Sequence, residues 1–355
     1  MTAFLPGVGI VLALELRQRV RGVAWYVLLG VFTALVALVT TLLWLSNGYT
    51  GGFGGFLFSG ILFFVLLLGT LVAPALSGNA INGDRDAGTL ATTQVTLLTT
   101  GQLVLGKFLA AWLTALAFLL VSLPFLGFAV LTGGVRLGTV TVSILVLAIE
   151  LGVVAAIGVG LSGVITRPLF SIVVTYLAVA GLSIGTLIVF TLAGIATSSE
   201  ARTTSIDVAF QTENEDPAAT DPVRCSPPVT TTYSVPRFDY YWGVLAANPY
   251  VVLADAAAGS FDTSGTPSDL FSGTAVLVRQ AQIPPDLDAT YDNCTDIREG
   301  RTPDFDTPRE IFDRTVPTWF VGLASHVILA SGALLWATWR TRTPAARLPR
   351  GSRIA

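Results

Sequence analysis

Long apolar segments alternate with short polar ones along most of the chain. Six segments hold about 20 or more mostly apolar residues, which is the length that a helix needs to cross a bilayer. They cover residues 23–45, 53–76, 103–131, 139–163, 168–196 and 317–339. Two of the six exceed that length, so we expect them to tilt, bend or extend beyond the bilayer. The pattern predicts an all-α polytopic membrane protein with six transmembrane helices.

Two segments depart from this pattern. FLPGVGIVLALEL, near the N-terminus, is apolar for about ten residues and then becomes basic, whereas a signal peptide begins with its basic region. We expect an interfacial helix that leads into the first span. The second segment, residues 197–316, is polar and lies between spans five and six. The chain therefore divides into a membrane domain with five spans (1–196), a polar domain (197–316), and the sixth span with a basic tail (317–355).

Composition supports a membrane protein. The chain is 52% hydrophobic and only 12% charged, against about 25% charged in a typical soluble domain. The charges are also segregated, because residues 197–316 contain 19 of the 23 acidic and 8 of the 20 basic residues. This acidic domain argues against a nucleic-acid partner, since phosphates need a basic surface.

Basic residues near span ends indicate the orientation, because Lys and Arg collect on the cytoplasmic side. With six spans, nearly all of them fall on one side: Arg17, Arg19, Arg21, Arg85, Lys107, Arg167, Arg340, Arg342, Arg347, Arg350 and Arg353. Arg136 is the exception, in a short loop on the other side. We therefore expect a plasma-membrane protein with both termini in the cytoplasm and residues 197–316 outside.

One motif suggests nucleotide binding. Gly101 to Lys107 read G-x-x-x-x-G-K, the spacing of a phosphate-binding loop. Such a loop follows a strand and continues with Ser or Thr, whose hydroxyl holds magnesium. Here Phe108 follows, and the next helix is a membrane span. We therefore expect no nucleotide site in this chain.

Other enzyme signatures are also absent from the sequence. It contains one histidine and no Cys-x-x-Cys pair. A metal cluster with several histidines cannot form from one, and a Ser-His-Asp triad could use only this residue. The acidic clusters lack the spacing of a calcium-binding loop. We expect neither catalysis nor a metal site in this chain.

Two ionisable residues fall inside predicted spans. Glu150 lies about 11 residues from the outer end of span four, and His326 about 9 residues from that of span six, so their depths are similar at about 1.5 Å per residue. Ionisable groups inside a membrane usually face a partner or a wet cavity. Either the two residues line a substrate path or form a pair, or they are polar groups satisfied within the bundle without a role in transport.

The only two cysteines, Cys225 and Cys294, lie in the domain predicted to be outside. That compartment favours a disulfide, with two unpaired thiols as the alternative. Two stretches of the same domain are more apolar. Residues 240–260 combine aromatic and aliphatic residues, which suits the outer membrane surface. Residues 268–282 fit a helix or a strand equally.

The segment between spans two and three is polar. Its threonines recur at helical spacing on one side: Thr89, Thr92, Thr93, Thr96, Thr99 and Thr100. Leu90, Leu97 and Leu98 form an apolar stripe, and acidic residues precede them, where carboxylates suit a helix N-terminus. These features predict an amphipathic helix. By itself this could be an ordinary membrane-surface helix.

The region from 73 to 112, APALSGNAINGDRDAGTLATTQVTLLTTGQLVLGKFLAAW, resembles the signature region of ABC-transporter permeases of the type-two exporter class. The resemblance rests on an acidic-Arg-x-x-Gly-Thr-Leu element and a Gly-Lys before span three. The matching residues are Asp84, Arg85, Gly88, Thr89, Leu90, Leu97, Leu98, Thr99, Gly106 and Lys107. ELRQRVR before span one, SLPFLGFAVLTGGV at 122–135 and Asn248-Pro249 are also similar. The nearest branch is the one linked with multicopper-enzyme maturation.

The resemblance implies that the segment is a coupling helix. It would dock on a separate ATP-binding subunit, which binds ATP and magnesium, while this chain would work as a homo- or heterodimer in the lipid bilayer. The contact residues would be Asp84, Arg85, Asp86, Gly88, Thr89 and Leu90. Ala91 and Thr100 depart from the family pattern, which has an acidic residue and a proline there, and the outer domain is longer than in minimal members.

The sequence thus favours the permease subunit of an ATP-driven exporter. One alternative is a non-transporting membrane module that relays ATPase motion to, or binds, an extracytoplasmic partner. A membrane enzyme that uses Glu150 and outer carboxylates lacks a recognisable catalytic set.

Overall fold

The computed structural model describes residues 4–47, 53–86, 98–209, 224–301 and 306–341. Six helices in this part are long and apolar enough to cross a membrane, which confirms the predicted multi-pass architecture. They are Val23–Ser46, Gly54–Asp86, Thr100–Leu131, Leu137–Val164, Pro168–Ala196 and Trp319–Thr341. Pro124 lies inside the third without ending it, since the α-helix runs unbroken from Thr100 to Leu131.

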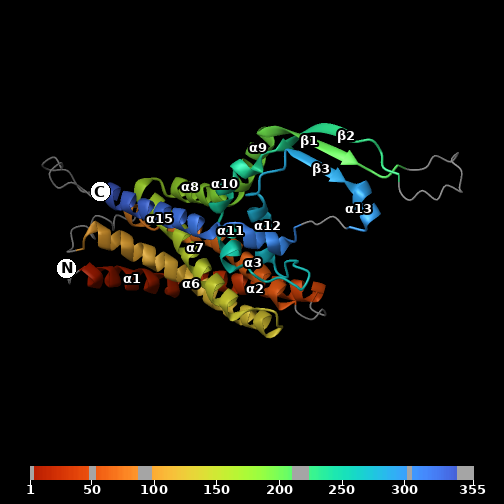
Figure 1. Cartoon of the computed structure of the whole chain (residues 1–355). Coiled ribbons are helices and arrows are strands. Elements are labelled where there is room, and N and C mark those ends of the chain that lie inside the picture. Colours follow the sequence, from red (N-terminus) through yellow and green to blue (C-terminus); the bar gives the residue numbers. More distant parts are fainter. Residues whose placement is uncertain (1–3, 48–52, 87–97, 210–223, 302–305, 342–355) are drawn as a thin grey trace.

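The elements of the membrane part follow the chain in order. They are α1 (Phe4–Arg21), α2 (Val23–Asn47), α3 (Gly54–Ser77), α4 (Asn82–Asp86), α6 (Thr100–Leu131), α7 (Leu137–Val164), α8 (Pro168–Ala180), the π turn η1 (Gly181–Gly185), α9 (Thr186–Ala196) and α15 (Trp319–Thr341). In Figure 1 the two labelled chain ends lie at the same end of the bundle, far from the strands. We refer to these as the terminal end and the sheet end.

The centre of the bundle is α7, the most buried of the six long helices. Its apolar core is shared with α3 and α6 through fully buried residues such as Leu62, Leu66 and Leu147. Small residues let α15 approach α7 closely, as is common between membrane helices. A Cβ atom added at Gly160 would lie 2.6 Å from the Cβ of Ala333.

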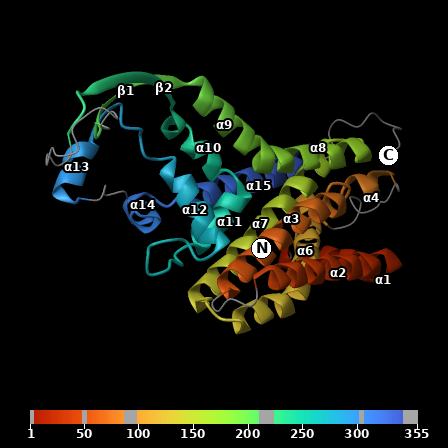
Figure 2. The ribbon, with the colours of Figure 1, turned by 90° about the vertical axis from the view of Figure 1, so that its right-hand side faces the viewer.

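Residues 197–316 contain a sheet, which the predicted all-α class did not include. The strands β1 (Ser198–Ile206), β2 (Val229–Pro236) and β3 (Asp288–Asp292) have the order β2-β1-β3, with β2 antiparallel and β3 parallel to β1. Threonine-rich stretches of β1 and β2 lie opposite each other, and β-branched residues favour extended backbone. Figure 2 shows this sheet continuing from α9, with α13 (Asn293–Glu299) at its far end.

The described part of this segment also contains η2 (Phe238–Tyr240), α10 (Trp242–Ala246), α11 (Pro249–Ala257), α12 (Leu270–Gln280) and α14 (Pro308–Arg314). Of these, α10, α11 and α12 contact long helices of the bundle, and α14 packs on α12. The stretch 268–282, which fitted helix or strand, forms the helix α12. The stretch 240–260 was expected at the membrane surface, yet α11 is buried: Val252, Leu253 and Ala254 are fully covered. Contacts with α7, α12 and α15 cover its apolar side chains.

Candidate functional site

A buried cluster of charges connects three elements at the terminal end. The ammonium group of Lys107, on α6, is 1% exposed and pairs with Glu15 of α1 and, at 2.7 Å, with Asp84 of α4. A buried ammonium is costly unless carboxylates accompany it. The lysine of the phosphate-loop-like motif is therefore occupied by two carboxylates of the chain itself.

The rest of that motif is the surface on which α1 lies. Gln102 donates to the carbonyl of Phe4 at 3.1 Å, and a Cβ atom at Gly106 would lie 2.6 Å from the Cβ of Val11. Further along, Arg19 donates to the hydroxyl of Thr114 at 3.1 Å. The two helices therefore run side by side in the same direction. The glycine of the motif permits a close approach between helices, which explains its presence without a phosphate.

Arg19 extends this network into the bundle. Its guanidinium also donates to the carbonyl of Leu76 at the end of α3, at 3.3 Å. Burial lowers the pKa of this guanidinium, and nearby Glu15 opposes the change. The helix predicted to be interfacial is thus fixed by polar contacts to α3 and α6.

The short helix α4 is also bonded to α7. The hydroxyl of Ser162 accepts from the backbone amides of Ile81 and Asn82, at 3.0 and 3.1 Å. The side chain of Asn82 donates to the carbonyl of Ile165 at 2.6 Å and accepts from Arg85 at 2.7 Å. Residues 81–85 are therefore bonded to α6 and to the end of α7, and to α1 through Lys107.

Half of the predicted ATPase-contact residues can be located. Asp84 and Arg85 belong to α4 and have partners within the chain, and Asp86 ends α4 exposed. Gly88, Thr89 and Leu90 lie outside the described residues. Thr99 is extended and caps the N-terminus of α6, so the predicted helix over 89–100 does not reach it.

The structure brings the two intramembrane ionisable residues together. Nδ1 of His326 lies 2.9 Å from a carboxylate oxygen of Glu150, and Nε2 lies 2.8 Å from the carbonyl of Ala247. Both side chains are almost fully buried. The pair connects α7, α15 and the end of α10. Both ring nitrogens of His326 and the carboxylate of Glu150 therefore have partners within the bundle.

A lateral cavity of about 680 Å³ lies between span two and span five. Exposed leucines such as Leu67, Leu71 and Leu177 form part of its wall, so it opens where lipid would surround the bundle. A few polar groups converge on it, among them Tyr250 and Asn248. Apolar walls with few placed polar groups are typical of small-molecule sites. We call it the lateral cavity.

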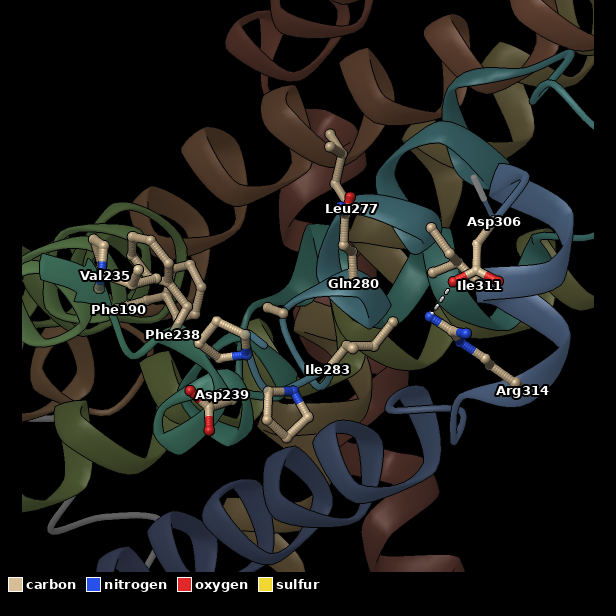
Figure 3. Close-up of a pocket in the computed structure, with 14 residues that line it drawn as sticks. Phe190, Val235, Phe238, Asp239, Leu277, Gln280, Ile283, Asp306, Ile311 and Arg314 are labelled. Atoms are coloured by element: carbon tan, nitrogen blue, oxygen red, sulfur yellow. Dashed lines mark ion pairs between the residues drawn. The ribbon is translucent and has the colours of Figure 1, made fainter. Parts of the chain in front are cut away.

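A second hollow of about 770 Å³ lies at the sheet end, between β2, η2, α12 and α14. In Figure 3, Phe190 and Phe238 lie together at one side of it, and Asp306 and Arg314 face each other at the other, 2.7 Å apart. Leu277 is exposed beside it. This outer pocket combines aromatic and aliphatic walls with charged groups.

Cys225 and Cys294 form a disulfide, with Cα atoms 5.5 Å apart. The bond joins the segment before β2 to α13. It therefore fixes the far end of the sheet.

Sequence reasoning missed Glu15, Asn82 and Ser162 as parts of the terminal cluster. One signal for Glu15 existed, because it is one of four acidic residues outside 197–316 and stands beside a basic run. Asn82 and Ser162 had no such signal, since their roles depend on which helices lie side by side. In the part of the chain that the structure describes, no group of three or more potential metal ligands occurs. Comparison with protein-family models and with curated proteins gives no match.

Proposed function

We propose that this chain is the membrane subunit of an ATP-driven exporter of the ABC type, with ATP hydrolysed by a separate subunit. The resemblance of residues 73–112 is the starting point. In this proposal the terminal end is cytoplasmic, residues 197–316 are outside, and the chain functions with a second permease copy and two ATPase subunits.

The observation that carries the proposal is the set of bonds between residues 81–85 and other helices. Asp84 pairs with Lys107 of α6, Lys107 pairs with Glu15 of α1, and the backbone amide of Asn82 donates to Ser162 of α7. A force applied to residues 81–85 would therefore reach several helices of the bundle. Coupling by rigid elements needs this kind of connection, whereas an ordinary surface helix does not.

The lateral cavity indicates the kind of cargo. Its walls are mostly apolar and it lies between membrane spans, so water-soluble ions and sugars would find few polar partners there. An apolar or amphipathic molecule that enters from the bilayer fits these walls.

The test is capture of the ATPase subunit from native membranes. Arg85→Glu combined with Leu90→Asp should abolish co-purification and coupled ATP hydrolysis, because both residues lie in the proposed contact segment. Arg309→Glu, at an exposed pair near the sheet end, is the matched charge-reversal control and should retain both. Full retention in the double variant would refute the proposed contact.

The outer pocket supports a second candidate function. A non-transporting module that binds an extracytoplasmic partner would use such a hollow, which lies on residues 190–314 at the sheet end. Leu277→Asp should then abolish capture of that partner without affecting ATPase binding. Transport of a cargo by reconstituted vesicles separates the two functions.

A further inference from the structure

Span five contains one turn that is wider than the rest. Its helix runs as α8, changes to the π turn η1 at Gly181–Gly185 and continues as α9. The amide of Thr186 donates to the carbonyl of Gly181, five residues earlier. Such turns are rare and frequently mark functional sites. Here Ser183 and Ile184 of the turn line the lateral cavity.

A buried side chain from another element binds this turn. Asn248, 2% exposed, donates its amide to the carbonyl of Ser183 at 2.6 Å and to the hydroxyl of Thr186 at 2.9 Å. That hydroxyl donates in turn to the carbonyl of Leu182 at 2.8 Å. The carbonyls of Leu182 and Ser183, both inside the π turn, therefore accept hydrogen bonds from side chains. The donor to Ser183, Asn248, comes from outside span five.

The position of Asn248 is itself fixed on three sides. Its amide oxygen accepts from the backbone amide of Tyr250 and so caps α11. The preceding residue, Ala247, accepts from His326, which pairs with Glu150. Two consecutive residues thus contact spans five and six directly, and span four through His326. A movement of α7 or α15 would be transmitted to the π turn through them.

We propose that Asn248 is a positioning residue that holds span five in its π-turn register and so determines which side chains of α9 face the lateral cavity. A regular α-helix turns by about 100° per residue. Conversion of the π turn to α would rotate α9 against α8 by about that angle and move Leu187 out of the cavity wall. Only the role of the cavity in transport rests on the proposed function; the register does not.

The first test is a thermodynamic cycle. Asn248→Ser keeps a side chain that caps a helix but is too short to reach Ser183. It should raise the unfolding equilibrium constant about tenfold, as expected for a lost buried hydrogen bond, in a detergent unfolding titration. In a chain without Ser183, where the turn has one residue fewer, the same substitution should change that constant less than twofold. Equal effects in both backgrounds would overturn the proposal.

The second test needs no deletion. The chain has no free cysteine. A single introduced cysteine can therefore carry a spin label while the native disulfide stays intact. Labels at Val189 and Phe190 follow the π turn, and a label at Leu177 precedes it. Val189 is exposed and Phe190 is half-buried, so in Asn248→Ser the oxygen accessibility should fall at 189 and rise at 190, which reverses their order, with 177 unchanged.

An unchanged order at 189 and 190, or an equal change at 177, would overturn the proposal. Neither measurement uses ATP, an ATPase or a cargo. Their outcome is therefore separate from that of the exporter proposal.

Discussion

At the scale of single residues, the buried charges of this protein have partners within the chain. Lys107 has two carboxylates, His326 has Glu150 and a carbonyl, and Arg279 pairs with Asp255 at 2.6 Å. Each of these pairs connects different helices. Because an unpaired buried charge is strongly destabilising, these residues select one arrangement of the helices.

The terminal cluster gives a first prediction. Lys107→Met should destabilise the protein by about 3 kcal/mol, because it leaves Glu15 and Asp84 close together without a cation. Adding Glu15→Gln should recover part of the loss. Arg309→Met, at a pair that is more than half exposed, should cost under about 0.5 kcal/mol. Unfolding titrations of the native chain, these three variants and Glu15→Gln alone measure this, and an additive double variant would contradict it.

The intramembrane pair gives a second prediction. His326→Leu should cost about 3 kcal/mol, since Glu150 would remain buried without its partner. Combining it with Glu150→Leu should restore most of the stability. Measuring transport by Glu150→Gln distinguishes a pair that lines a cargo path from a pair that has no role in transport. Unchanged transport and folding in both Glu150→Gln and His326→Gln would exclude a cargo path through these residues.

At the scale of elements, close contact between helices depends on small residues. Gly106 of α6 allows α1 to pack closely against it, and Gly160 of α7 does the same for α15. The sequence predicted the helices themselves from their length and apolarity. It did not predict that α1 packs along α6, because an amphipathic helix of that length fits a membrane surface equally well.

Gly160 allows a test at this scale. Gly160→Ala should destabilise the bundle by about 1 to 3 kcal/mol, because its Cβ would meet the backbone of Ala333 as well as its side chain. Gly138→Ala, on the same helix with open space around it, should be neutral or stabilising by up to about 1 kcal/mol. Thermal unfolding of the purified variants compares them, and equal effects would argue against close packing at Gly160.

At the scale of the whole molecule, residues 197–316 are joined to the bundle at several points. Asp255 of α11 accepts from the backbone amide of Trp319, the first residue of α15, at 3.0 Å. Arg136, the one basic residue on the unexpected side, donates to the carbonyl of Gly259 at 3.1 Å. The sheet, in contrast, extends away from the bundle in Figure 2, and its far end is fixed by the disulfide.

The disulfide therefore predicts a local effect. Cys225→Ser with Cys294→Ser removes a bridge that spans 69 residues and should cost about 2 to 4 kcal/mol. The loss of stability should affect mainly the sheet. Proteolysis should therefore cut residues 198–236 faster while the six spans stay intact. In the native chain, fragments cut between the two cysteines should separate on a gel only after reduction. Separation without reductant would contradict the bridge.

The sequence by itself determined the six spans and the polar segment between spans five and six. These depend on local length, apolarity and residue order, which are properties of consecutive residues. The tertiary structure decided the partners of Lys107, the contact of Glu150 with His326, the burial of α11 and the π turn held by Asn248. Each of these depends on which distant segments lie side by side, and no local pattern specifies that.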